Sequence, residues 1–419
     1  MSRLIIKNIG PIREVDFKLN KINVFMGPQS SGKSTIAKIV SFCVWLDKIF
    51  SRDGLPKGEP KIDYIQKLKT YHRLTDGYFN EESQIYFSGN FVELNYNNCH
   101  PVTLSQFQYS NIDRDGEYTC TIGTRENKPI DNNSKIIYIP AERNLVSTIY
   151  NLQEYLRDRD NIQDFVVNWY EAKRKYSPNN KLNILNLGVH YYSEKEDIDR
   201  LQLQGGGDIA LQIASSGLQS VVPLLTMLDY VTSGVYDEKR PISVKERDEL
   251  MKKINELLEE KRNSEQNIDY SLLLDLIDAK NYRYSQVILE EPEQNLFPST
   301  QRDLIYHLLA LLNSGKEQNR DHRLTFTTHS PYVLYALNNC MMGHLVNNQL
   351  QGEEKEDYLN NKFLSETSWI DPKTVSVWEI EKGKIRTIQD KDNIISENYF
   401  DLKMTELTDE FYQMLNYYE

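Results

Sequence analysis

The sequence predicts an α/β fold with a mainly parallel central sheet, a β-rich insertion and a helical lobe. A short apolar strand at residues 21–26 runs into a glycine-rich loop at 27–35, and apolar residues at helical spacing follow that loop. The continuous apolar run at 135–140 suits a strand buried on both faces, as in a parallel sheet. Two more apolar strands, at 287–289 and 323–328, end in polar side chains. These strands are the expected centre of the sheet.

We expect one head over residues 1–419, interrupted by an insertion. Residues 51–134 are rich in Asn, Asp, Gly, Ser and Tyr. They hold strand-like pieces at 85–87, 91–94 and 118–122, which predict that the insertion is β-rich.

The expected helical lobe covers residues 144–282, and the stretch 144–200 looks largely helical. A capping box at 243–246 starts one charged amphipathic helix of about twenty residues, which is far too short for a coiled-coil arm. Residues 283–419 form the last part, which carries two of the core strands.

Composition limits the classes of partner. The chain has a net charge of −12 and a pI near 5.3, so a nucleic-acid contact must be confined to a local patch. The four cysteines lack metal-ligand spacing, which argues against a zinc site or disulfide framework and fits a reducing compartment. No signal region is evident, and no apolar run approaches the ~18 residues of a membrane span. We therefore expect a cytoplasmic protein that does not bind a membrane.

The loop at 27–35 is the most informative feature, because it fits the pattern G-x-x-x-x-G-K-[ST] between a strand and a helix. In such a loop the backbone N–H groups bind phosphate, while Lys33 reaches the outer phosphates and Ser34 the metal ion. The alternative is a glycine-rich turn before a core helix. The context favours a nucleoside triphosphate site, with candidate residues Gly27, Ser30, Ser31, Gly32, Lys33, Ser34 and Thr35.

Two adjacent carboxylates, Glu290 and Glu291, follow the apolar strand at 287–289. Successive side chains at a strand end point in different directions, so Glu290 can face a magnesium ion while Glu291 faces the attacking water. We expect Glu290 to be a metal ligand and Glu291 to be the general base, a role worth about 10²–10⁴ in rate. The alternative is a strand followed by an acidic turn.

His329 follows the strand at 323–328 and is the third catalytic candidate, beside Lys33 and Glu291. An imidazole at the same sheet edge can donate a hydrogen bond to the terminal phosphate and sense its loss. The alternative is a structural histidine.

Residues 215–219 precede an apolar helical run, and Ser216 to Gln219 fits a capping box. The plain interpretation is a well-capped helix. The second interpretation is a phosphate contact, because a capped helix start with a glycine offers amides and a hydroxyl. Its candidate residues are Ser216, Gly217 and Gln219.

Together these motifs resemble those of the ATP-binding-cassette (ABC) ATPases of the RecF, SMC and OLD (overcoming lysogenisation defect) group. The matching residues are 27–35 for Walker A, Ser216, Gly217 and Gln219 for the signature, 287–291 for Walker B, 293–298 for the D-loop region and His329 for the switch histidine. The resemblance runs from Ile5 to about Thr387. Residues 290–298 and 328–331 look most like the ATPases of bacterial anti-phage systems such as PARIS and Septu.

The resemblance implies a P-loop NTPase fold of the ABC-ATPase head type that uses ATP and Mg²⁺. It also implies that two heads sandwich two ATP molecules, with Ser216 and Gly217 of one head at the terminal phosphate held by the other. Glu290 stands where many cassette ATPases have aspartate, and Leu218 replaces the second glycine of the usual signature. Glu142 and Arg143 are only candidates for the glutamine-loop residue.

OLD-type nucleases carry an additional domain with an acidic cluster that includes an Asp-x-Asp pair. The pairs Asp197/Asp199 and Asp390/Asp392 do not follow apolar strands, so we interpret both as solvated surface. We therefore expect no nuclease domain on this chain.

Two classes of function remain open. The first is an ATP-driven sensor or scaffold that dimerises and controls a separate effector in anti-phage defence; the expected effector is a nuclease encoded nearby. The second is a RecF-like DNA repair or maintenance ATPase, for which the basic-aromatic cluster at 169–176 is the best DNA-contact candidate, although a solvated helix face explains it better. A third possibility is a nucleotide-binding module that hardly turns over.

Overall fold

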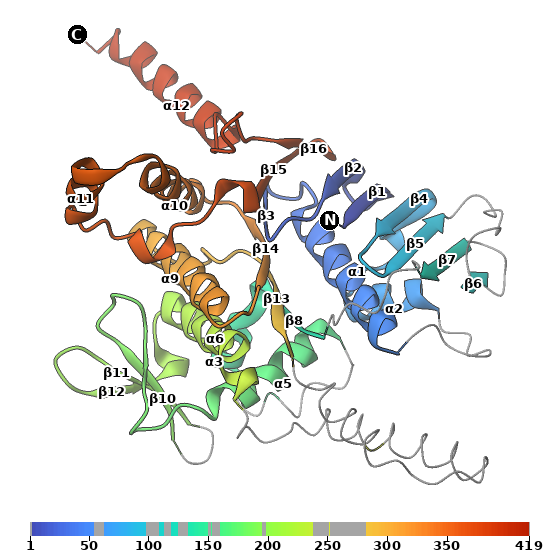
Figure 1. Cartoon of the computed structure of the whole chain (residues 1–419), viewed down its shortest axis with the longest axis horizontal. Helices are drawn as coiled ribbons and strands as arrows, with labels where there is room; N and C mark the ends of the chain where they lie inside the picture. The colour runs from blue at the N-terminus through green and yellow to red at the C-terminus, as the bar shows by residue number, and fades with distance from the viewer. Residues whose placement is uncertain are drawn as a thin grey trace.

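The computed structural model has a parallel sheet at its centre (Figure 1). It describes residues 2–53, 63–97, 109–112, 119–124, 133–149, 152, 160–194, 198–237, 251 and 282–418. The parallel strands stand in the order β15 (Val375–Glu381), β3 (Ile22–Met26), β14 (Arg323–Thr328), β13 (Tyr284–Leu289) and β8 (Ser134–Ile139). The phosphate loop and the two predicted catalytic strand ends therefore belong to three neighbouring strands.

The sheet continues beyond β15 through strands that are mostly antiparallel. The order is β16 (Lys384–Thr387), β2 (Ile12–Lys18), β1 (Arg3–Ile9), β4 (Phe79–Ser88), β5 (Val92–Asn97), β7 (Thr119–Thr124) and β6 (Tyr109–Ile112). Strands β4 to β7 lie within 51–134, and β4 pairs with β1, so they extend the main sheet. Helix α2 (Tyr64–Tyr71) starts at Asp63, whose side chain accepts a hydrogen bond from the Gln66 N–H.

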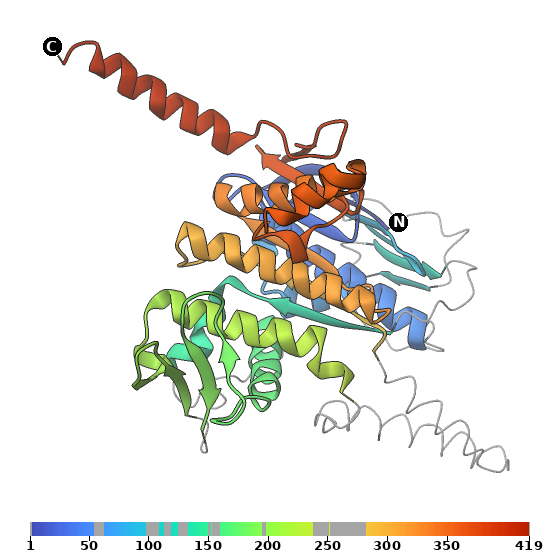
Figure 2. The same ribbon diagram turned by 60° about the vertical axis from the view of Figure 1, so that its left-hand side comes forward.

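Helices cover both faces of the sheet (Figures 1 and 2). Helix α1 (Lys33–Asp53) packs on one face in a core that includes Phe25. Helices α6 (Ser216–Thr232), α9 (Pro298–Glu317) and α10 (Pro331–Gln349) pack on the other face in a core that includes Val24. Adjacent residues of β3 thus point to opposite faces, which is why this strand reads as continuously apolar. The remaining helices are α3 (Leu145–Thr148), α5 (Asn161–Lys173), α11 (Gly352–Asn360) and α12 (Tyr399–Leu415).

The expectation that residues 144–200 are largely helical is wrong for their second half. A four-stranded antiparallel sheet forms there from β9 (Leu182–Asn183), β10 (His190–Ser193), β11 (Asp199–Gln202) and β12 (Asp208–Ala210). Tyr191 and Leu201 are paired across it and fully buried. Strands of two to four residues are too short to show a period of two in the sequence. The predicted helix that starts at 243–246 lies outside the described residues.

In the part of the chain that the structure describes, no helix combines the length and apolarity that crossing a bilayer requires.

Candidate nucleotide-binding site

The phosphate loop joins β3 to α1 and has the backbone geometry that its glycines predict. Gly27 has φ +146° and Gly32 has φ +103°. A Cβ atom on Gly27 would lie 2.4 Å from the carbonyl oxygen of Ile380, and one on Gly32 would lie 2.3 Å from a methyl carbon of Ile12. Both positions therefore require glycine. Ser30 and Ser31 lie in the loop, and Ser34 and Thr35 lie in the first turn of α1.

The side chain of Lys33 is buried within its own loop. Its Nζ atom donates hydrogen bonds to the carbonyl oxygens of Gly27 (2.9 Å) and Pro28 (2.6 Å) and to Ser31 Oγ (3.4 Å). Burial lowers the pKa of Lys33 to about 8, although the charges of Glu291 and Glu293 act in the opposite direction. The lysine thus lies near the carboxylates that follow β13.

Glu290 is buried at the end of β13 and is held by the neighbouring strand β8. Its backbone N–H donates to the Ile139 carbonyl at 2.9 Å, and its carboxylate accepts a hydrogen bond from the Tyr138 hydroxyl. Burial raises the pKa of Glu290, and the Tyr138 hydrogen bond partly offsets that rise. Glu290, the predicted metal ligand, therefore already accepts a hydrogen bond from Tyr138 through one of its two carboxylate oxygens.

Glu291 and His329, two of the predicted catalytic residues, meet at the sheet edge. Glu291 Oε1 lies 3.0 Å from His329 Nε2. This hydrogen bond is the main cause of a lowered pKa for Glu291. The backbone of Glu291 has φ +44°, and its N–H donates to the Thr327 carbonyl (3.1 Å) and to Thr327 Oγ1 (3.2 Å). Strand β14 therefore holds both the base and the histidine.

Glu293 is a site residue to which the sequence assigned no individual role. Its Oε1 atom accepts hydrogen bonds from the Thr328 hydroxyl (3.0 Å) and from the His329 backbone N–H (2.5 Å). Its second oxygen is buried and has no hydrogen-bond partner among the described residues. Burial raises the pKa of Glu293. The carboxyl group fixes the loop that presents the switch histidine.

Arg143 is the second residue whose role the sequence did not reveal. It is fully buried in the 3₁₀ turn Ala141–Asn144, and burial lowers its pKa to about 10. Its guanidinium donates to backbone carbonyls of three separate segments, namely Pro140 (3.4 Å), Ser220 (3.2 Å), Glu290 (2.9 Å), Glu291 (2.7 Å) and Pro292 (3.3 Å). Arg143 thus joins the signature helix α6 to the turn that carries Glu291.

The predicted capping box at Ser216 is wrong by one residue. Ser215 is the N-cap, with its hydroxyl 3.5 Å from the Leu218 N–H, and Ser216 is the first helical residue. Two adjacent serines both fit the pattern, so the sequence could not separate them. The Gln219 side chain donates to the Gln212 carbonyl at 2.8 Å.

The signature residues contact the D-loop region and leave Ser216 exposed. A Cβ on Gly217 would lie 2.8 Å from the Asn295 carbonyl, and the Asn295 amide donates to Ser220 Oγ at 3.1 Å. Ser216 itself is exposed. Among the described residues, no hydrogen bond joins Ser216, Gly217 or Gln219 to the phosphate loop.

Part of the basic-aromatic cluster at 169–176 is buried, whereas Arg174 and Lys175 are exposed. Trp169 is buried, and Lys173 forms a buried ion pair with Asp199 at 3.2 Å. The interpretation of Asp199 as solvated surface is therefore wrong, because its partner on α5 neutralises it in the interior. Asp390 and Asp392 are exposed, as expected.

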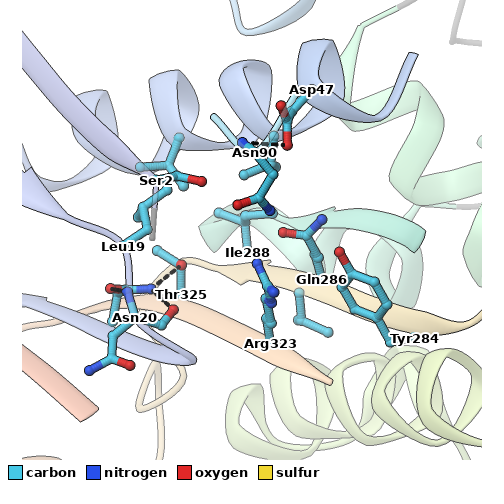
Figure 3. A pocket seen from close by; sticks show the side chains of 14 residues that line it. Ser2, Leu19, Asn20, Asp47, Asn90, Tyr284, Gln286, Ile288, Arg323 and Thr325 are labelled. Carbon is cyan, nitrogen blue, oxygen red and sulfur yellow. Dashed lines mark hydrogen bonds between the residues drawn. The ribbon is translucent and has the colours of Figure 1, made fainter. Parts of the chain in front are cut away.

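A separate cavity of about 30 Å³ lies away from these residues (Figure 3). Its lining includes Gln286 of β13 and Thr325 of β14, whereas Glu291 and His329 of the candidate site follow the ends of these strands. A volume of this size is far too small for a nucleotide.

Comparison with known proteins gives a family and finds similar solved structures. Two of these structures are the SMC head domain from Thermotoga maritima (12% identity, 80% of this chain and 90% of that chain, TM-score 0.33), and the recombination mediator protein RecF-ATPrS in the RecFOR pathway (10% identity, 92% and 97%, TM-score 0.35). No curated protein matched.

The predicted fold class is confirmed. The phosphate loop follows one central parallel strand, the two carboxylates follow another, and the flanking sheet and helices complete an α/β P-loop fold. Residues 3–365 match the family described as AAA domain. Because this match covers most of the chain, the protein belongs to the AAA domain family.

Proposed function

We propose that this chain binds ATP with Mg²⁺ and hydrolyses it to ADP and phosphate. The observation that carries the proposal is the 3.0 Å contact between Glu291 and His329 beside the buried Lys33. An ionised carboxylate held by an imidazole is suited to take a proton from an attacking water. This contact supports hydrolysis over a module that only binds nucleotide.

The surrounding side chains fit the cofactor. The Ser34 hydroxyl and the Glu290 carboxylate are hard oxygen donors of the kind that Mg²⁺ prefers, and they would hold it. Lys33 and the loop amides would bind the outer phosphates. The magnesium ion would neutralise charge on the phosphates, and His329 would donate a hydrogen bond to the terminal one.

A second copy of the chain would complete the site. Ser216 is exposed and is not bonded to its own phosphate loop, while α6 is fixed to the Glu291 turn through Arg143. A pair of heads would place Ser216 and Gly217 of one copy at the terminal phosphate bound by the other. ATP hydrolysis in one copy would then depend on the contact that Ser216 and Gly217 of its partner make with the terminal phosphate.

A complementation experiment tests this arrangement. Lys33→Ala chains and Ser216→Arg chains should each be inactive alone. When mixed, they should regain ATP turnover, because a mixed pair contains one intact phosphate loop facing one intact signature. The matched control mixes Lys33→Ala with Glu291→Gln. Both residues belong to the same half-site, so each composite site of a mixed pair keeps one defect and turnover should stay lost. Turnover that is never restored by any mixture contradicts the paired site.

The proposed role is an ATP-driven sensor or scaffold that controls a separate effector, a nuclease, in anti-phage defence. Support comes from the likeness of residues 290–298 and 328–331 to the ATPases of such systems. Burial of Lys173 and Trp169 reduces the best DNA-contact candidate to the exposed Arg174 and Lys175, so the RecF-like alternative stays open. Expression with the neighbouring genes, followed by native mass measurement of the Glu291→Gln form with ATP, should show a co-purifying partner. Salt-sensitive DNA binding by the isolated chain would favour the alternative instead.

A further inference from the structure

Helix α12 (Tyr399–Leu415) extends away from the rest of the structure (Figures 1 and 2). None of its residues is buried. Met404, Leu407 and Phe411 are 67%, 65% and 58% exposed. Isolated helices shorter than about 12–15 residues are marginal in water, and most helices gain their stability from packing an apolar face. A 17-residue helix with this much exposed apolar surface therefore needs a partner.

The apolar residues of α12 form a seam for another helix. Met404, Leu407, Phe411, Met414 and Tyr418 recur at alternating spacings of three and four residues. This is the a/d repeat that packs one helix against another. The four acidic side chains Asp401, Glu406, Asp409 and Glu410 lie outside the seam.

The base of α12 is bonded to elements of the nucleotide-binding edge. The Tyr399 N–H donates to Glu379 Oε2 at 2.8 Å, and Glu379 pairs in register with Met26, the residue before the phosphate loop. The Tyr335 hydroxyl donates to Asp401 Oδ1 at 2.9 Å. Tyr335 lies on α10, which starts two residues after His329. The helix thus begins at the sheet edge that the proposed second head would face.

We infer that α12 pairs in parallel with α12 of a second copy of this chain. The inference rests on the proposed head pair, because the second head would face the edge at which α12 begins. Charge favours the parallel orientation: Lys403 would face Thr408 of the partner subunit, and Glu410 would face Leu415 of the partner subunit, so no like charges meet. An antiparallel pair with the seam in register would bring the two Glu410 side chains together.

Cross-linking of full-length chains tests the pairing. Met404→Cys should form a disulfide-linked dimer under mild oxidation, because equivalent seam positions meet in a parallel pair. The control is Asp409→Cys on the outward face of the same helix, which should cross-link at least about tenfold more slowly. Wild-type chain controls for the native cysteines, of which Cys43, Cys120 and Cys340 are buried. In an antiparallel pair, position 404 would instead face 414, about 15 Å along the helix from its equivalent.

The outcomes separate this inference from the proposed function. Equal cross-linking at positions 404 and 409, or linkage only between Met404→Cys and Met414→Cys chains, overturns the parallel pair. A chain that hydrolyses ATP but does not cross-link at 404 also overturns it and leaves the proposed function intact. A chain that cross-links at 404 but has no ATP turnover supports the pair and refutes the function.

Loss of the seam gives an independent measurement. Leu407→Asp together with Phe411→Asp should weaken dimerisation of the full chain at least about tenfold, since both side chains would lose the apolar burial that holds the seam together. Asp409→Asn should leave the dissociation constant unchanged. Unaltered dimerisation of the seam variant contradicts the inference.

Discussion

The guanidinium of Arg143 donates a 2.7 Å hydrogen bond to the backbone carbonyl of Glu291, a residue whose φ is +44°. A left-handed backbone at such a residue costs on the order of 1–3 kcal/mol and persists only where its surroundings hold it. Thr327 binds the N–H side of Glu291 and Arg143 binds the carbonyl side. The direction of the Glu291 carboxylate therefore depends on a positioning residue that does not touch the nucleotide site itself.

Substitution of Arg143 should lower kcat and leave KM for ATP nearly unchanged. Arg143→Ala releases the Glu291 turn, and a misplacement of about 1 Å can cost on the order of 100-fold in rate. Arg143→Lys keeps a positive charge but lacks the planar guanidinium that donates to several carbonyls at once. Its kcat should therefore lie between those of the wild type and Arg143→Ala. Steady-state ATP turnover measures both parameters.

A purely structural role would give a different result. It would lower the amount of folded enzyme, so active-site titration would show fewer sites with unchanged turnover per site. Added guanidinium should partly restore kcat of Arg143→Ala and should not affect the exposed control Arg174→Ala. Equal turnover per site in wild type and Arg143→Ala contradicts the positioning role.

Removal of His329 should change the pH dependence of hydrolysis. The hydrogen bond from His329 is the main cause of the lowered pKa of Glu291, and burial acts in the opposite direction. In His329→Ala the pKa of Glu291 should therefore rise. A general base is lost as pH falls through its pKa, so the acidic limb of the kcat profile should move to higher pH. His329→Gln, which can still donate a hydrogen bond, should move it less. An acidic limb at the same pH in all three proteins would refute this coupling.

The predicted site residues were visible in the sequence because each follows an apolar strand. Lys33, Glu291 and His329 come from three strands that are separate in sequence and adjacent in the sheet. Parallel strands end at the same edge, so the local patterns also predicted that these residues meet. The fold class followed from the same strands.

Arg143 and Glu293 could not be assigned in the same way. Arg143 acts through carbonyls at positions near 140, 220 and 291, and any residue type can supply a carbonyl. Glu293 binds a backbone N–H of the switch loop, which also leaves no mark in the sequence. The sequence predicted a solvated position for Lys173, which is buried. Its neutralising partner Asp199 is 26 residues away, so the local pattern could not reveal the ion pair.

ATP binding should take up protons at alkaline pH. Burial lowers the pKa of Lys33 to about 8, so above that pH most free protein carries a neutral lysine. Bound phosphates favour the charged form of Lys33 and raise its pKa. ATP binding at alkaline pH is therefore coupled to the uptake of a proton from solvent by Lys33. Calorimetry in two buffers of different ionisation enthalpy should show uptake at pH 8.5 and little at pH 6.5. Lys33→Arg stays charged and should show no such uptake; equal uptake by both proteins would refute the assignment.

His72 should make the fold sensitive to acid. Its ring is buried between Tyr71 and Tyr138, with centroid distances of 4.8 Å and 5.0 Å, and neither nitrogen has a hydrogen-bond partner among the described residues. Burial lowers its pKa from 6.5 to about 3. Between these values the unfolded chain binds the additional proton, so the free energy of unfolding should fall by about 1.4 kcal/mol for each pH unit of acidification.

The substitution His72→Phe keeps an aromatic ring between the two tyrosines and removes the titrating group. From pH 6 to pH 4 its free energy of unfolding should decline less steeply than that of the wild type, by about 1.4 kcal/mol per pH unit. Buried His322, whose pKa is lowered to about 4, should supply part of the remaining slope in both proteins. Urea unfolding at several pH values measures the two slopes. Parallel slopes would mean that His72 is reached by water or by a proton donor in the native state, and that its burial does not set the acid limit of this fold.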